Sequence, residues 1–115
     1  MKESYPYEVR GSLWIECKQE RFFGPGRVEL LIAIAETGSI SKAAKQMGMS
    51  YKKAWEMVNA LNAQTARPVV ILQTGGDKGG GSTLTDEALQ LINYHRLLRE
   101  RFARFLERET RRLTI

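Results

Sequence analysis

The stretch "ETGSISKAAKQMGMSYKKAWEMVNALN", residues 36–62, decides the fold. Ser39 and Ser50 each follow a break and precede apolar residues at helical spacing. A serine in that place caps a helix, because its hydroxyl accepts a hydrogen bond from an amide of the first turn. Gly48 lies between the two segments and suits the left-handed residue that ends a helix. The stretch therefore predicts two short helices joined by a tight glycine turn.

The two predicted helices have apolar faces that match each other. The apolar positions are Ala43, Ala44 and Met47 in the first helix and Ala54, Met57, Val58 and Leu61 in the second, which runs from residue 51 to about 62. The small alanines permit a close approach of the helices. Lys52, Glu56 and Asn59 project from the opposite side of the second helix. This pattern predicts a helix-turn-helix.

A strand and a helix are expected before this motif. Residues 12–20, "SLWIECKQE", alternate well enough to predict one half-buried strand, which the sequence "FFGPG" then ends. Gly24 and Pro25 suit the cap and first position of a helix, because proline lacks an amide that would be unpaired there. Gly38 ends this helix. Its core face is expected to comprise Val28, Leu31, Ile32 and Ala35, and a second stripe, Leu30 and Ile34, is expected to face another subunit.

Two β-prone runs follow the motif. "RPVVILQT" and "STLT" are joined by "GGDKGGG", residues 75–81. A strand, a glycine-rich tip carrying Lys78 and a return strand predict a β-hairpin wing. The predicted fold is therefore mainly α with a small β component, a winged helix-turn-helix.

One long helix is expected from Thr85, as its cap, to about Arg112, with Asp86 and Glu87 in the electropositive first turn. Its seam positions, with His95 filling the gap between Leu91 and Leu98, are Ala88, Leu91, His95, Leu98, Phe102 and Phe105. This spacing is typical of a helix–helix contact. A helix of roughly forty ångströms, at ~1.5 Å per residue, is longer than a small core needs. We therefore expect this helix to join two copies of the chain in a homodimer.

Composition bounds the class of protein. The chain has 115 residues, a length that suits one domain, and its net charge is +5. The expected organisation is a tail at 1–11, the winged helix-turn-helix at 12–84 and the long helix at 85–115. No run approaches the ~20 apolar residues of a membrane helix, and the start has no apolar signal segment. The single cysteine, Cys17, is interpreted as a buried thiol in a reducing compartment. We expect a cytoplasmic protein.

Basic residues gather on the motif. Residues 41–67 contain five bases, Lys42, Lys45, Lys52, Lys53 and Arg67, and one acid, Glu56. In such a motif the second helix enters the major groove and the first contacts phosphates. The candidate DNA-binding residues are Ser39, Ser41, Lys42, Lys45, Ser50, Tyr51, Lys52, Lys53, Glu56, Asn59, Lys78, Gly79 and Gly80. A solvated helix face with a plain hairpin is the alternative interpretation.

Other functional classes find little support. The glycine-rich loop is not a P-loop, because Lys78 precedes the glycines instead of following them. His95 lacks partners for catalysis or metal binding, and Trp14 and Trp55 are interpreted as packing residues. The sequence shows no catalytic set, no metal-ligand spacing and no effector site. We therefore expect no enzyme, no cofactor and no metal.

Two segments carry a family resemblance. Residues 26–62 and 74–98, in particular "GSISKAAKQMGMSYKKAW" and "TGGDKGGG" with the following "LT", resemble the N-terminal DNA-binding domain of the molybdate-dependent transcriptional regulator (ModE) family. The resemblance extends over about residues 17–106. More distantly, the architecture is similar to that of the LysR-type regulators. It implies a bacterial transcriptional regulator that binds double-stranded DNA as a homodimer.

The resemblance does not extend to oxyanion sensing. Full-length members of the family carry a further C-terminal molybdate-binding region, and no residues here match that site. The ending "RRLTI" favours a single-domain form, with a truncated chain as the alternative. A second hypothesis also stays open, in which the winged helix pairs with a sensor-bearing partner without reading DNA.

Overall fold

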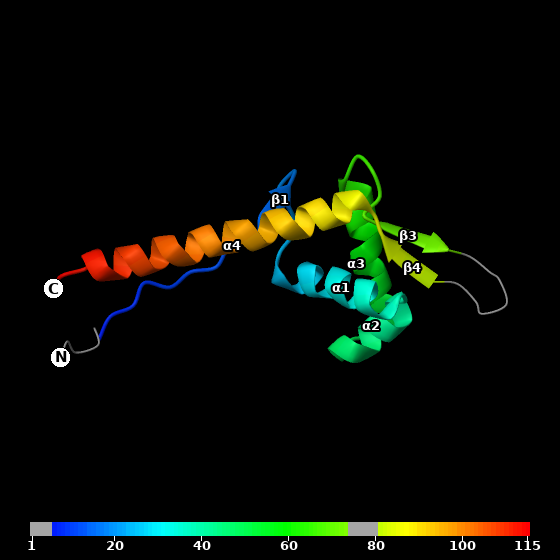
Figure 1. Cartoon of the computed structure of the whole chain (residues 1–115), viewed down its shortest axis with the longest axis horizontal. Coiled ribbons are helices and arrows are strands. Elements are labelled where there is room, and N and C mark those ends of the chain that lie inside the picture. Colours follow the sequence, from blue (N-terminus) through cyan, green and yellow to red (C-terminus); the bar gives the residue numbers. More distant parts are fainter. Residues whose placement is uncertain (1–5, 74–80) are drawn as a thin grey trace.

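The computed structural model describes residues 6–73 and 81–115. In chain order the elements are β1 (Ile15–Cys17), β2 (Glu20–Phe23), α1 (Pro25–Thr37), α2 (Ile40–Met47), α3 (Tyr51–Gln64), β3 (Val70–Gln73), β4 (Gly81–Leu84) and α4 (Asp86–Arg112). The first three helices and the two hairpins form a head, and α4 runs out of this head toward the C-terminus (Figure 1). The molecule is accordingly elongated, with principal extents of 64 × 30 × 22 Å. The predicted winged helix-turn-helix with a long final helix is confirmed.

The helix-turn-helix has the predicted caps. The Ser39 hydroxyl accepts a hydrogen bond from the Lys42 amide, and the Ser50 hydroxyl accepts one from the Lys53 amide, both at 3.1 Å. Gly48 has a φ of 70°, and its amide donates back to the last turn of α2. The Met49 amide also donates to Ala44 O at 3.0 Å. These bonds satisfy the helix ends, so the turn between α2 and α3 is short and well defined.

The core lies where the three head helices meet. Ala43, Ala44 and Ala54 are buried at the α2–α3 contact, together with Val58 and Leu61 of α3. The predicted apolar faces of α2 and α3 are thus confirmed, with Met47 and Met57 half-buried at their edges.

The predicted core face of α1 is confirmed for Val28 and Leu31 and wrong for Ile32 and Ala35. Its buried residues are Leu30, Leu31, Ala33 and Ile34, whereas Ile32 and Ala35 of the predicted core face are exposed. Leu30 and Ile34 have no exposed surface, so they cannot contact another subunit. The observed buried face is rotated about the helix axis from the predicted one, because α1 is contacted on two sides, by α2 and by β4.

The predicted first strand is in fact a hairpin. β1 pairs antiparallel with β2, with Cys17 opposite Glu20. The turn residues Lys18 and Gln19 have positive φ values of 52° and 71°, which suit the twist of a two-residue hairpin turn. Neither residue is a usual turn former, so the sequence carried no turn signal here. Cys17 is half-buried, less than expected.

The predicted wing is confirmed at its base. β3 and β4 pair antiparallel, with Val70 opposite Leu84 and Gln73 opposite Gly81. The Ser82 amide donates to Gly38 O at 2.9 Å, which joins the wing to the end of α1. The predicted wing tip, including Lys78, Gly79 and Gly80, lies outside the described residues.

The long helix α4 packs on the head only along its first half. Thr85 caps it by accepting from the Ala88 amide at 3.2 Å. Ala88 and His95, two of the predicted seam positions, are buried inside the chain, and the His95 ring meets Phe23 edge-on at 5.4 Å between ring centroids. Their assignment to a dimer seam is therefore wrong, because the head already covers that side of α4.

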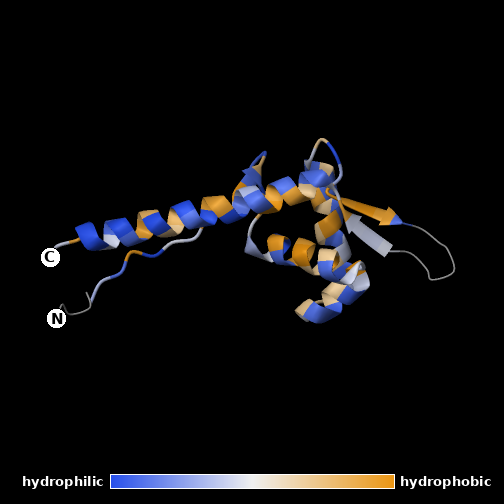
Figure 2. Ribbon diagram, viewed as in Figure 1, coloured by the Kyte–Doolittle hydropathy of each residue, from blue (hydrophilic) through white to orange (hydrophobic). Residues whose placement is uncertain are grey.

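The second half of α4 has a different neighbour. Residues 6–14, the N-terminal segment, run beside it (Figure 1), and the Val9 amide donates to Thr110 Oγ1 at 2.8 Å. Gly11 lies so close to Phe102 that a Cβ there would be 3.1 Å from Phe102 Cζ. Hydrophobic and hydrophilic residues alternate along this half of the helix (Figure 2), and Phe105 is 47% exposed.

Candidate nucleic-acid interface

One side of α3 is left polar and exposed. Lys52, Glu56 and Asn59 lie on it at intervals of four and three residues, and all three are exposed, as predicted. Tyr51 and Lys53 flank this side at the start of the helix and are also exposed. The structure gives none of the Lys52, Glu56 and Asn59 side chains a hydrogen bond among the residues it describes. This face is therefore available to a ligand outside the chain.

Trp55 belongs to the same face. It follows Lys52 by three residues and precedes Asn59 by four, and it is 39% exposed. Trp55 was interpreted as a packing residue, but it lies on the outer side of α3, because Ala54 and Val58 are the residues that point into the core. An indole at this position adds a large flat apolar surface between polar groups. Trp14 is also exposed, with the Arg21 guanidinium 4.2 Å from its ring centroid, but it lies at the other hairpin.

α2 presents a second set of candidate residues. Ser41, Lys42 and Lys45 are exposed on α2, which precedes α3 across the glycine turn. Ser39 and Ser50 are already used as acceptors in the helix caps. Their hydroxyl protons remain able to donate, since a capping hydroxyl is bonded only through its oxygen. The two cap serines thus have a structural role that is separate from any contact with a ligand.

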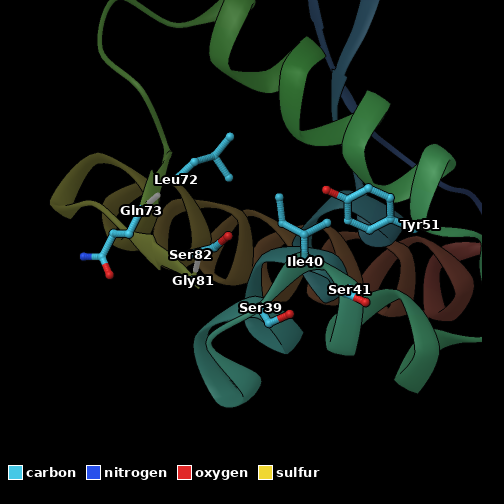
Figure 3. A pocket seen from close by; sticks show the side chains of 8 residues that line it. All are labelled: Ser39, Ile40, Ser41, Tyr51, Leu72, Gln73, Gly81 and Ser82. Carbon is cyan, nitrogen blue, oxygen red and sulfur yellow. The ribbon is translucent and has the colours of Figure 1, made fainter. Parts of the chain in front are cut away.

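A cavity of about 320 Å³ separates α2 from the wing. Figure 3 shows its lining, which consists of Ser39, Ile40, Ser41, Tyr51, Leu72, Gln73, Gly81 and Ser82. Ser82 is only 5% exposed, and its hydroxyl points toward the cavity with no hydrogen bond to the described residues. The cavity therefore collects hydroxyl groups at the amino end of α2, where the helix dipole favours an anion. Sequence reasoning missed Ser82, Leu72 and Gln73, because only the pairing of β3 with β4 brings them to α2.

The base of the wing is held in a defined orientation. Asn62, at the end of α3, accepts hydrogen bonds from the amides of Val69 and Val70. The Thr85 amide donates to Val69 O at 3.1 Å, and the Thr85 hydroxyl donates to Pro68 O at 2.8 Å. The base of the hairpin is thereby bonded to both α3 and α4, which sets its orientation relative to the exposed face of α3.

The charge of this surface is almost wholly positive. The ion pairs of the described residues lie elsewhere, in the N-terminal segment, between Arg67 and Glu87, and along α4. Lys42, Lys45, Lys52 and Lys53 therefore have no carboxylate partner among the described residues. Positive side chains that the fold does not neutralise raise the local concentration of a polyanion.

No group of metal-ligating side chains occurs in residues 6–73 and 81–115. None of the described helices combines the length and the apolar character needed to cross a membrane.

Comparison with known proteins agrees with this architecture. Residues 26–89 match the family described as "Bacterial regulatory helix-turn-helix protein, lysR family". The chain is 43% identical over 86 residues to "Transcriptional regulator ModE" of Haemophilus influenzae, which covers 75% of this chain and 34% of that relative. It is 52% identical over 69 residues to "Molybdenum-pterin-binding protein MopB" of Rhodobacter capsulatus, covering 60% of this chain and 26% of the relative. The chain thus spans about a third of these relatives or less.

A solved structure shows the same fold. The crystal structure of the CbnR_DBD-DNA complex has a TM-score of 0.54 and 24% identity, and the match covers 73% of this chain and 91% of that one. The predicted resemblance to ModE is confirmed over the N-terminal three quarters of the chain. The matched residues 26–89 contain the helix-turn-helix and the wing strands described above. The chain belongs to the bacterial regulatory helix-turn-helix proteins of the lysR family.

Proposed function

We propose that this protein is a transcriptional regulator that binds double-stranded DNA as a homodimer in the bacterial cytoplasm. The observation that carries the proposal is the exposed face of α3, which carries Lys52, Trp55, Glu56 and Asn59. A helix of this kind enters the major groove, where asparagine pairs with adenine and lysine with guanine or phosphate. The proposal assigns no catalytic chemistry to the chain.

The surfaces beside α3 suit the DNA backbone. Lys42 and Lys45 of α2 are free of carboxylates among the described residues and reach toward phosphates. The cavity at the amino end of α2 offers the hydroxyls of Ser41, Tyr51 and Ser82 to one phosphate oxygen or more. Contacts of this kind position the module without reading sequence. The wing strands continue the same surface, so the wing extends the contact along the duplex.

The homodimer is supported by an exposed apolar stripe that runs along α4 into its second half. Tyr94 and Phe105 are 52% and 47% exposed, and Leu98 is half-buried, all at a spacing of about 3.5 residues. Two copies joined here present two recognition helices related by a two-fold axis. The expected site is then a pseudo-palindrome with half-sites separated by one or more helical turns of DNA.

Fluorescence anisotropy with labelled duplexes across a salt series tests the proposal. The duplexes are the protein's own promoter region and a scrambled control of the same composition. We expect tight binding to the promoter, a steep loss of affinity with salt from counterion release, and a large preference over the scrambled duplex. The double variant Lys52→Ala/Lys53→Ala should lose binding, whereas Arg10→Ala, in the N-terminal segment, should not. Weak binding that is indifferent to sequence, with dimerisation intact, would favour a protein-pairing module instead.

A further inference from the structure

The two tryptophans of the chain are equally exposed but have different surroundings. Trp14 is 40% exposed and Trp55 is 39% exposed. The Trp14 indole N–H donates to Glu16 Oε2 at 2.9 Å, and the Arg21 guanidinium lies 4.2 Å from the centroid of the Trp14 ring. The Trp55 indole N–H has no hydrogen-bond acceptor among the described residues. Trp55 therefore offers a free donor and an exposed apolar ring edge to a group outside the chain.

Trp55 lies on α3 where the helix is expected to meet base edges. Lys52 precedes it by three residues and Asn59 follows it by four, and both are exposed. Tyr51 precedes it by four residues, one helical turn of about 5.4 Å, and Figure 3 shows the Tyr51 ring at the cavity that is assigned above to a phosphate. Trp55 is thus one turn beyond that backbone contact. It is also the fifth residue of α3, within the amino-terminal half that reads bases in a recognition helix.

The chemistry of an indole matches one base of the major groove. Thymine presents a 5-methyl group there, with its O4 acceptor beside it, whereas guanine, cytosine and adenine present only polar groups. An indole likewise has an apolar ring edge beside an N–H donor. Lys52, Glu56 and Asn59 share this side of α3 and are polar, and Tyr51 lines the cavity. Trp55 is therefore the side chain of this face that is suited to bury a methyl group.

We propose that Trp55 is a specificity-determining residue that recognises the 5-methyl group of one thymine in each half-site. This inference rests on the DNA binding proposed above and goes beyond it by assigning one base, and one chemical group of that base, to one side chain. Asn59, four residues later on the same side of α3, suits adenine. Both residues favour A·T pairs, so we expect A·T pairs where this part of α3 meets the groove.

Replacement of thymine by deoxyuridine tests this proposal, because uracil differs from thymine only in lacking the 5-methyl group. The promoter duplex is synthesised in two forms, one with thymidine and one with deoxyuridine at every such position. Fluorescence anisotropy gives the dissociation constant of the protein for each form. The loss of one buried methyl group corresponds to about a fourfold loss of affinity. A duplex with two half-sites should therefore bind on the order of tenfold more weakly in its deoxyuridine form.

Variants at the two tryptophans assign this difference to one side chain. Trp55→Ala should bind the two forms of the duplex equally, because the contact is already lost when either the indole or the methyl group is absent. Trp55→Phe should keep most of the difference, since its ring still covers a methyl group. Trp14→Ala is the matched control, because Trp14 is equally exposed but lies on the β1–β2 hairpin. It should keep the full difference of the wild type.

A scan with one deoxyuridine at a time then locates the thymine. We expect the loss of affinity at one position and at its symmetry-related position in the other half-site, because each subunit of a two-fold dimer contributes one Trp55. The loss at these positions should be absent in Trp55→Ala. Small losses spread over many positions would instead assign the effect to the shape and stiffness of the duplex, and would overturn the inference.

The outcomes separate this inference from the proposed function itself. Wild-type binding that is indifferent to sequence would overturn both. Sequence-specific binding with equal affinity for the two forms of the promoter would overturn only the role of Trp55, whatever the variants do. A difference that Trp55→Ala retains, or an equal loss by Trp55→Ala on the promoter and scrambled duplexes, would have the same meaning, since Trp55 would then contact the backbone or nothing. Circular dichroism confirms that each variant is folded.

Discussion

Asn62 and Val70 hold each other through a reciprocal pair of hydrogen bonds. The Asn62 amide nitrogen donates to Val70 O at 3.0 Å, and the Val70 amide donates to Asn62 Oδ1 at 3.2 Å. The same oxygen accepts from the Val69 amide at 2.8 Å. One side chain at the end of α3 thus completes the backbone bonding at the start of β3. The end of α3 and the base of the wing are therefore joined by the hydrogen bonds of one side chain.

Replacing Asn62 and Asn59 in turn should distinguish an effect on stability from an effect on DNA affinity. Asn62→Ala leaves three partly buried backbone groups without their partner, so we expect a loss of about 1–3 kcal/mol in the free energy of unfolding. Asn59→Ala, three residues earlier on the exposed face of α3, should change that free energy by less than about 0.5 kcal/mol and should lower DNA affinity. Urea unfolding and anisotropy on both variants provide the check. Equal stabilities would show that the reciprocal bonds are not important.

The turn between α2 and α3 depends on a left-handed glycine. Gly48 has a φ of 70°, and a Cβ added there would meet nothing within 4 Å. The expected cost of Gly48→Ala is therefore purely conformational, about 1–2 kcal/mol. Gly26→Ala in the first turn of α1 also meets no neighbour and should instead stabilise by about 0.4–1 kcal/mol. Thermal unfolding of the two variants should show shifts of opposite sign, and shifts of the same sign would contradict this account.

Ser82, a buried residue that lines the cavity, provides a test of it. Ser82→Ala removes a group that has no hydrogen bond to the described residues, so the free energy of unfolding should change by less than about 1 kcal/mol. DNA affinity should fall several-fold if the cavity holds a phosphate. Ser39→Ala is the contrasting variant, because the lost helix cap should cost about 0.5–2 kcal/mol of stability. Unchanged affinity for Ser82→Ala would remove the cavity from the DNA interface.

His95 should make stability depend on pH. Burial against Phe23, and to a lesser extent the charge of Arg99, lowers the pKa of His95 below its ordinary value of 6.5. The unfolded chain then binds the proton more readily than the folded chain, so stability is fully present above about pH 6.5 and is lost as the pH falls from there toward the folded pKa. The effect levels off below the folded pKa.

The variant His95→Phe distinguishes the pH dependence that His95 causes from the pH dependence that the carboxylates cause. It removes the titrating group and also the buried Nε2, which has no hydrogen-bond partner among the described residues. The decline in unfolding free energy between pH 7.5 and 5.5 should be smaller in the variant than in the wild type. Urea titrations at several pH values measure it, and identical pH profiles would assign the dependence to other groups.

Local chemistry determined the helix-turn-helix. Ser39, Gly48 and Ser50 act within one or two helical turns of their own position, through caps and a left-handed backbone that each residue type prefers. The exposed lysines of α3 followed from the same local periodicity. For this reason the two helices of the motif, their ends and the exposed polar side of α3 could be predicted from the sequence, and the start of the long helix α4 could be placed by its Thr85 cap.

The tertiary structure decided which apolar residues are buried and which remain exposed. The sequence marks α1 and α4 as apolar on more than one side, but only the packing of the head shows that Leu30 and His95 are inside and that Ile32 and Phe105 are outside. Likewise, Ser82 joins Ser41 at one cavity only through the pairing of β3 and β4. Burial is a property of neighbours distant in sequence, because apolar surface is hidden by whichever element reaches it, and local periodicity carries no record of that neighbour.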